Sequence, residues 1–148
     1  MFDVIAWTLF AVHGALMFVD EFRFHRHRTM QRWERIGHPL DTLTVVAPLA
    51  VAVFAAPGAT ANAVYIALAV FSSIFITKDE WQHHEHCPAA EQWLHALLFV
   101  LHPVLLWFMY TVWQDGGSAL PFVALLASGG MLLHQVVYWN VWEPRARG

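Results

Sequence analysis

Five long apolar segments follow one another along the chain, and they constrain its fold more than any other feature. Each is near the ~20 residues that a helix needs to cross the hydrocarbon layer of a membrane, the second being on the short side. No long alternating strand is visible, and a backbone inside lipid must satisfy its own hydrogen bonds. The sequence therefore predicts an all-α polytopic membrane bundle of about five transmembrane helices. The segments are Phe2 to about Phe24, Pro39 to Pro57, Asn62 to Ile76 with its pattern continuing through Trp81, Pro88 to Trp113, and Leu120 to about Trp142.

The composition supports this interpretation over a buried soluble bundle. Of the 148 residues, 58% are hydrophobic and 13% are charged. A soluble domain of this size cannot bury that much apolar surface, so the excess is expected to face lipid. The first segment lacks the basic start and cleavage site of a signal peptide, so we expect it to be retained as a span. We see no internal repeat and predict a single domain over residues 1–148, with no basic field for nucleic acid.

The basic residues predict the orientation of the bundle. Five spans place the two ends of the chain on opposite sides, and all eight Lys and Arg fall on the side of the C-terminal end. The positive-inside rule assigns that side to the cytoplasm, so the N-terminus is predicted outside, in a bacterial inner membrane. These residues are Arg23, Arg26, Arg28, Arg32, Arg35, Lys78, Arg145 and Arg147.

Carboxylates and imidazoles gather at the same cytoplasmic ends of four predicted helices. Four pairs, Asp79 and His83 among them, are four residues apart, and residues at that spacing share a helix face. At a rise of ~1.5 Å per residue, the groups on different helices come out at similar depths in the membrane. We therefore expect them to meet inside the bundle. The other pairs are Glu21 and His25, Glu80 and His84, and Glu91 and His95, and His83 lies three residues after Glu80.

Mixed oxygen and nitrogen donors predict a metal site. Such donors suit iron, manganese or zinc, and the lone Cys87 excludes an all-thiolate site. The number of carboxylates favours two divalent ions with bridging carboxylates, and iron is the first choice. Glu34 and Glu143 lie beside arginines and are interpreted as solvated ion pairs. The predicted metal ligands are Glu21, His25, Asp41, Glu80, His83, His84, Glu91 and His95.

The ligand chemistry resembles that of soluble di-iron carboxylate bundles, in which glutamates and Glu-x-x-His motifs project from four helices. Glu80-Trp81-Gln82-His83 is one such motif. Segments 25–27 and 83–86 are also similar to the His-rich boxes of membrane hydroxylases and desaturases, without their full spacing. These resemblances imply a di-iron oxidoreductase that acts on a lipid or another apolar substrate.

Three other functions remain open from the sequence. A zinc-dependent intramembrane lipid hydrolase would use Glu80 or Glu91 as general base for a zinc-bound water. A metal-ion carrier or sensor would need ligands along a path through the membrane. A b-type haem protein would need a histidine as axial ligand. Deep histidines are available for the last two roles, although each can equally be hydrogen-bonded inside the bundle: His13, His102 and His134.

Overall fold

The computed structural model describes residues 2–26, 31–78 and 80–142, and over these residues it is helical with no strand. Four of its continuous helical stretches are long and apolar enough to cross a membrane, and α3 is a shorter apolar helix. The all-α class is thus confirmed with four candidate spans, while the fifth crossing stays a prediction. In chain order the elements are α1 (Phe2–Val19), the π-helix η1 (Asp20–His25), α2 (Arg32–Phe54), α3 (Ala59–Phe75), α4 (Glu80–His86), α5 (Ala89–Asp115), α6 (Leu120–Val137) and the π-helix η2 (Tyr138–Trp142).

The outer surface of the bundle is rich in large apolar side chains. Phe18 of α1, Ile74 of α3 and Leu133 of α6 are each more than half exposed. A monomeric soluble protein rarely exposes apolar patches of this extent. The surface is therefore compatible with an integral membrane protein whose helices face lipid.

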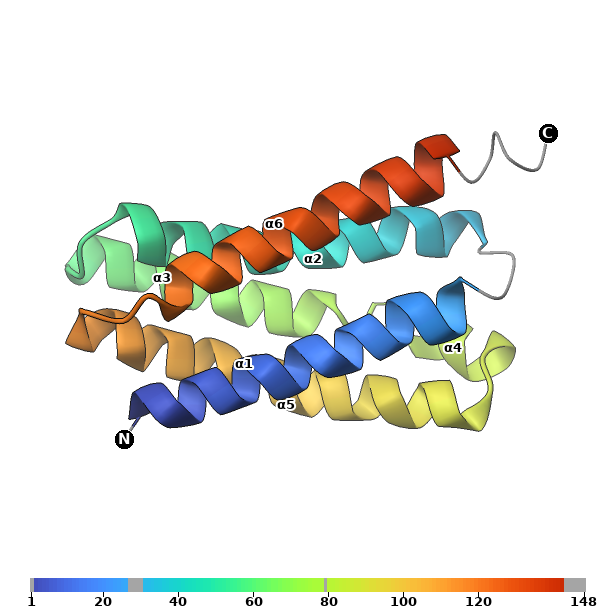
Figure 1. Ribbon diagram of the computed structural model, residues 1–148, viewed down its shortest axis with the longest axis horizontal. Coiled ribbons are helices and arrows are strands. Elements are labelled where there is room, and N and C mark those ends of the chain that lie inside the picture. The colour runs from blue at the N-terminus through green and yellow to red at the C-terminus, as the bar shows by residue number, and fades with distance from the viewer. Residues whose placement is uncertain (1, 27–30, 79, 143–148) are drawn as a thin grey trace.

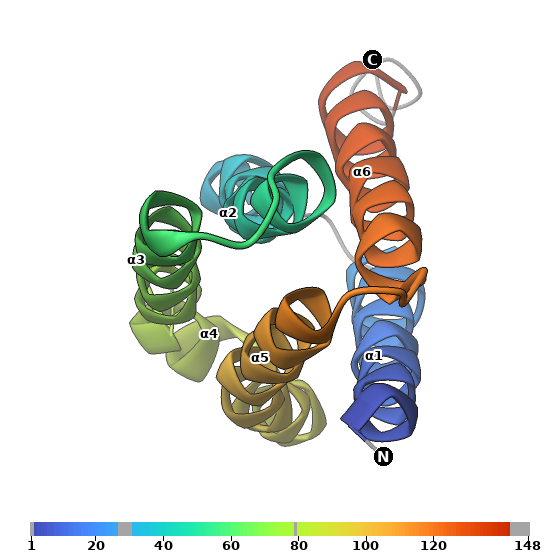
Figure 2. The same cartoon turned by 90° about the vertical axis from the view of Figure 1, so that its left-hand side faces the viewer.

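The helices pack side by side along their length. α1 lies along α5, and α2 lies between α3 and α6 (Figures 1 and 2). The start of α1 and the end of η2 lie at opposite ends of the bundle (Figure 1). Successive long helices run in opposite directions along the bundle, which brings the end of α1 and the starts of α2 and α5 to one end (Figure 1).

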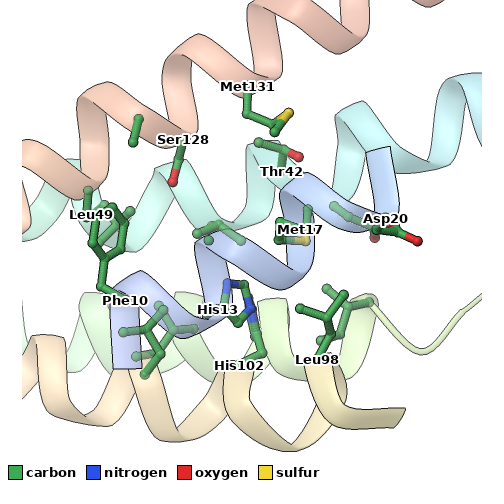
Figure 3. Close-up of a pocket in the computed structure, with 18 of the residues that line it drawn as sticks. Phe10, His13, Met17, Asp20, Thr42, Leu49, Leu98, His102, Ser128 and Met131 are labelled. Carbon is green, nitrogen blue, oxygen red and sulfur yellow. The ribbon is translucent and has the colours of Figure 1, made fainter. Parts of the chain in front are cut away.

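The interior changes character along the bundle. At the end where α1 begins, the core is apolar and includes Leu49, Tyr65, Met109 and Trp113. The two polar ring groups there are satisfied, since Tyr65 Oη donates to the Leu106 carbonyl at 2.8 Å and Trp113 Nε1 donates to the Ala55 carbonyl at 3.0 Å. At the opposite end the buried side chains include carboxylates and imidazoles. Between the two ends the helices enclose a cavity of about 250 Å³ (Figure 3).

The helix predicted to continue from Ile76 through Trp81 ends earlier than the pattern indicates. α3 stops at Phe75, and α4 is a separate short helix. Ser73 Oγ donates to the Ala69 carbonyl and Thr77 Oγ1 to the Ile74 carbonyl, both at 2.8 Å. The Thr77 amide also bonds to Ile74 with the tighter i→i+3 spacing. The two Thr77 bonds satisfy the Ile74 carbonyl at the helix end, where the chain turns away, whereas the Ser73 bond lies inside the helix.

Candidate metal centre

A π-helical turn at the end of the first span sets the geometry of the site. η1 begins at Asp20 and ends at His25, and π-helical hydrogen bonds join residues five apart. Asp20 and His25 are therefore one turn apart, and His25 Nδ1 lies 3.6 Å from Asp20 Oδ2. The predicted pairing of His25 with Glu21 assumed α-helical winding. The wider turn brings Asp20 to His25 in place of Glu21.

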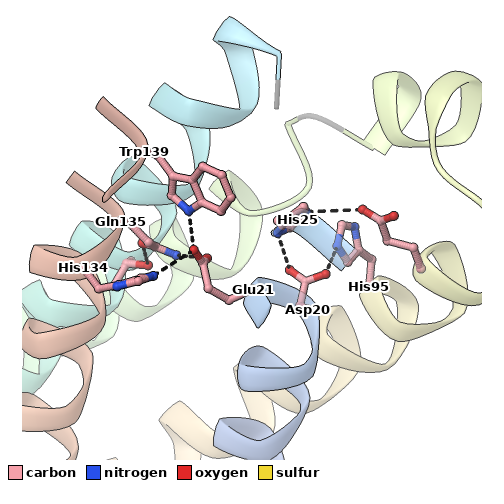
Figure 4. A network of polar contacts seen from close by, with 9 residues as sticks. Asp20, Glu21, His25, His95, His134, Gln135 and Trp139 are labelled. Carbon is pink, nitrogen blue, oxygen red and sulfur yellow. Dashed lines mark hydrogen bonds and ion pairs between the residues drawn. The ribbon is translucent and has the colours of Figure 1, made fainter. Parts of the chain in front are cut away.

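Helix α5 brings two further donors to this pair. Glu91 and His95 lie four residues apart near its start, and both are buried. His95 Nε2 is 3.0 Å from Asp20 Oδ1, and His25 Nε2 is 3.3 Å from Glu91 Oε1 (Figure 4). One donor atom from each of these four residues lies within 4.8 Å of the others. Two carboxylates and two imidazoles can therefore hold one metal ion.

Two more groups of donors overlap with the first. His25, Glu34 and His38 form one, and Glu34, Cys87 and Glu91 form the other, again with donor atoms within 4.8 Å of one another. The three groups are connected because they share His25, Glu34 and Glu91. We call the seven residues together the acid–histidine cluster: Asp20, His25, Glu34, His38, Cys87, Glu91 and His95.

The interpretation of Glu34 as a solvated ion pair is wrong. Its side chain is completely buried. The backbone N–H of Gln31 donates to Glu34 Oε2 at 2.9 Å in a capping box at the start of α2. This helix start faces the bundle, so the carboxylate lies inside although arginines flank it in the sequence. Glu143, which received the same interpretation, lies outside the described residues.

A short internal repeat would have revealed Glu34 and His38. The pattern Asp-Glu-aromatic-x-x-His occurs at residues 20–25 and again at 79–84. Each copy is followed by Glu-x-x-x-His, at Glu34–His38 and at Glu91–His95. The packing follows the same plan, because α1 lies along α5 while its counterpart α3 lies along α2. The repeat is confined to these polar positions, which is why a search of the whole chain for a longer one misses it.

Glu21, a predicted ligand, lies in a different polar network. It accepts hydrogen bonds from Trp139 Nε1 and from Gln135 Nε2, the latter at 3.2 Å, and His134 Nε2 lies 3.5 Å away (Figure 4). Thr42 Oγ1 in turn donates to Gln135 Oε1 at 2.7 Å. This Glu21 network connects η1 with α6, η2 and α2. Its carboxylate is buried and fully engaged by side chains of those elements.

The remaining predicted ligands are placed around the cluster. Asp41 Oδ1 accepts a charged hydrogen bond from Lys78 Nζ at 2.6 Å. Glu80 begins α4 and is partly buried, whereas His84 is exposed. The side chain of His83 lies outside the described part of the structure. Of the seven predicted ligands whose side chains are described, the structure brings three into the acid–histidine cluster: His25, Glu91 and His95.

The substitution Asp41→Asn should leave the metal content of the purified protein unchanged, because Asp41 pairs with Lys78 outside the three donor groups. The matched substitution Glu91→Gln, of equal size and charge change, should lower it. Inductively coupled plasma mass spectrometry of both variants makes the comparison. A clear fall in Asp41→Asn would instead make Asp41 a ligand, as the sequence pattern predicts.

Comparisons of the chain with protein-family models, with curated proteins and with solved structures found no match. The function is therefore inferred from the arrangement of the residues alone.

Proposed function

We propose that this chain is an integral-membrane di-iron oxidoreductase that acts on a lipid or another apolar substrate. One observation carries the proposal: six buried donors and the partly buried His38 form three overlapping groups at one end of an apolar bundle. Burying ionisable groups inside a membrane protein is costly, and such groups commonly mark functional sites. A cluster of carboxylates and imidazoles recovers that cost when it binds cations.

Two ions fit the donor set better than one. Glu91 belongs to the first and third groups and Glu34 to the second and third, so a carboxylate lies at each junction with the third group and could be shared between neighbouring ions. Asp20 and His95 would complete the first ion's ligands, and His38 the second ion's. Carboxylate and imidazole donors suit iron, with zinc and manganese as competitors, because affinity alone does not select among them.

The proposed reaction is oxygenation of a carbon–hydrogen bond by dioxygen. One oxygen atom enters the substrate as a hydroxyl group and the other leaves as water. The balance requires two electrons and two protons, and we assign the electrons to a separate one-electron carrier protein. The donor side chains would balance the charge of the metal ions and hold them in position. Burial of the cluster would keep bulk water from the reaction.

The orientation of the site follows from charge. The exposed arginines Arg23, Arg26 and Arg32 lie on the same ends of the helices as the cluster. The positive-inside rule places that end in the cytoplasm and supports a bacterial inner-membrane protein. A fifth crossing by α3 belongs to this proposal: its 17 residues extend about 26 Å, close to the ~30 Å hydrocarbon layer.

Elemental analysis and an absorbance spectrum of detergent-purified protein test the proposal. We expect about two irons per chain, as in the carboxylate di-iron bundles, and no haem band. One zinc per chain would support the zinc-dependent lipid hydrolase instead. A haem band would support the b-type haem protein. Absence of bound metal after reconstitution with iron or zinc would reduce the cluster to an ion-pair network and overturn the proposal.

A further inference from the structure

The cavity of about 250 Å³ leads from the acid–histidine cluster toward the middle of the bundle. Asp20, His38 and His95 of the cluster line one end of it. Leu49 and Met109, from the apolar core, line the other end. The cavity therefore joins the candidate metal centre to the hydrophobic interior, and helices α1, α2, α5 and α6 form its walls (Figure 3).

The cavity opens sideways between two helices. Gly14 and Phe18 of α1 and Ala127 of α6 line it and are also exposed on the outer surface of the bundle. α1 packs mainly on α5 and α6 mainly on α2, so the seam between α1 and α6 is loosely filled. In a membrane this seam faces lipid. Molecules that enter here come from the bilayer.

The walls of the cavity require an apolar occupant. Some polar side chains in its middle are already engaged: the His102 ring contacts the His13 ring with centroids 5.7 Å apart, and His102 Nε2 lies 3.0 Å from Ser72 Oγ. Ser72 is itself bonded to Thr44 at 2.9 Å. Methionine, leucine and phenylalanine side chains make up most of the remaining surface. Polar contacts to a ligand are thus expected mainly at the cluster, with Ser128 of α6 as a further polar group in the lining.

The size and shape of the cavity indicate that its occupant is a single hydrocarbon chain. The α1 residues that line it extend from Phe10 to Asp20, about 15 Å along the helix. A cavity of that length and volume is narrow. An engineered cavity of about 150 Å³ holds benzene, so this one has room for about ten carbon atoms.

We propose that one unbranched acyl chain of a membrane lipid enters between α1 and α6 and lies in this cavity, with a segment of the chain at the acid–histidine cluster. The inference rests on the proposed function for the chemistry at the cluster. It names the substrate class, a saturated or unsaturated acyl chain taken directly from the bilayer.

Photolabelling of detergent-purified protein that has been incubated with iron tests the proposal. The probe is palmitic acid that carries a diazirine at the middle of its chain. We expect labelled peptides to contain cavity residues such as Met17, Leu98 and Met131. Gly14→Trp should reduce this labelling about tenfold or more, the loss that follows from a 1.4 kcal/mol weaker affinity. A Cβ added at Gly14 meets no heavy atom within 4 Å, so the helix accepts the substitution while the indole fills the seam.

Two further variants complete the experiment. Ala127→Trp fills the seam from α6 and should have the same effect. Gly130→Trp is the matched control, because Gly130 is exposed on α6, lies outside the cavity lining and also has open space for a side chain. Undiminished labelling in both seam variants would overturn the proposal, as would equal labelling of the exposed Leu126 and Leu133 in the unmodified protein.

Metal analysis of the same samples separates this inference from the proposed function. Bound iron without labelling of cavity residues would support the metal centre and refute the acyl-chain site. Cavity labelling without any bound metal would leave the chain-binding site standing and refute the oxidoreductase.

Discussion

The substitution His25→Ala should weaken iron binding by the purified protein by about 100-fold or more. Loss of a group that merely orients a metal ligand already costs 10–100-fold in affinity, so removal of the ligand itself is expected to cost at least as much. His25 belongs to two of the three donor groups and is completely buried at the centre of the cluster. Its ring lies next to those of His38 and His95, with centroids 4.5 Å and 6.4 Å away.

Iron content after dialysis against graded concentrations of a chelator measures this effect. His84→Ala is the control, because His84 is exposed on α4 and lies outside the donor groups. Retention of both irons by His25→Ala at every chelator concentration would refute the assignment of the cluster. Circular dichroism of the variant verifies that the helices are intact, so that a loss of iron is not a loss of fold.

The substitution Glu21→Ala should lower the free energy of unfolding by about 2–4 kcal/mol, because it leaves the buried Trp139 and Gln135 donors without their acceptor. Metal content should stay the same. The Glu21 network joins four elements across the bundle, and no other described contact links η1 to η2 through a carboxylate. Thermal unfolding in detergent, followed by circular dichroism, measures the change.

The conservative variant Glu21→Gln distinguishes the two roles that Glu21 could have. Its amide oxygen can still accept one of the hydrogen bonds, so most of the stability should return. If Glu21→Ala instead lost metal and kept its unfolding temperature, Glu21 would be a metal ligand, as its spacing from His25 predicts. A fall in both the metal content and the unfolding temperature would mean that the Glu21 network holds the acid–histidine cluster in position.

The helical bundle was predictable because apolar runs and breakers are local properties of the sequence. The end of the bundle that holds the polar cluster was also predictable, because antiparallel helices return their polar ends to the same level. Glu91 and His95 share a face at ordinary α-helical spacing, and the structure places both in the cluster. These inferences need only helix geometry and chain direction.

The parts that could not be predicted depend on winding and packing. Nothing in residues 20–25 indicates a π-helix, yet this one feature places Asp20 at the site where the sequence predicted Glu21. The burial of Glu34 depends on which side of α2 faces the bundle, and the neighbouring Arg32 and Arg35 suggest the opposite side. His38 and Glu34 were within reach of the sequence through the repeat with Glu91 and His95.

The distribution of the donors over the chain has a consequence for how the protein is made. Synthesis and insertion proceed from the N-terminus, so Asp20, His25, Glu34 and His38 enter the membrane before the ribosome reaches the codon for Glu91. The segment up to the end of α2 holds four of the seven donors, without the three that come later in the chain, Cys87, Glu91 and His95. The donor set is complete only when α5 has inserted. If the cluster binds iron as proposed, the metal would join the early and late parts of the chain after both are in the membrane, and a chain that stops before α5 could not hold the finished centre.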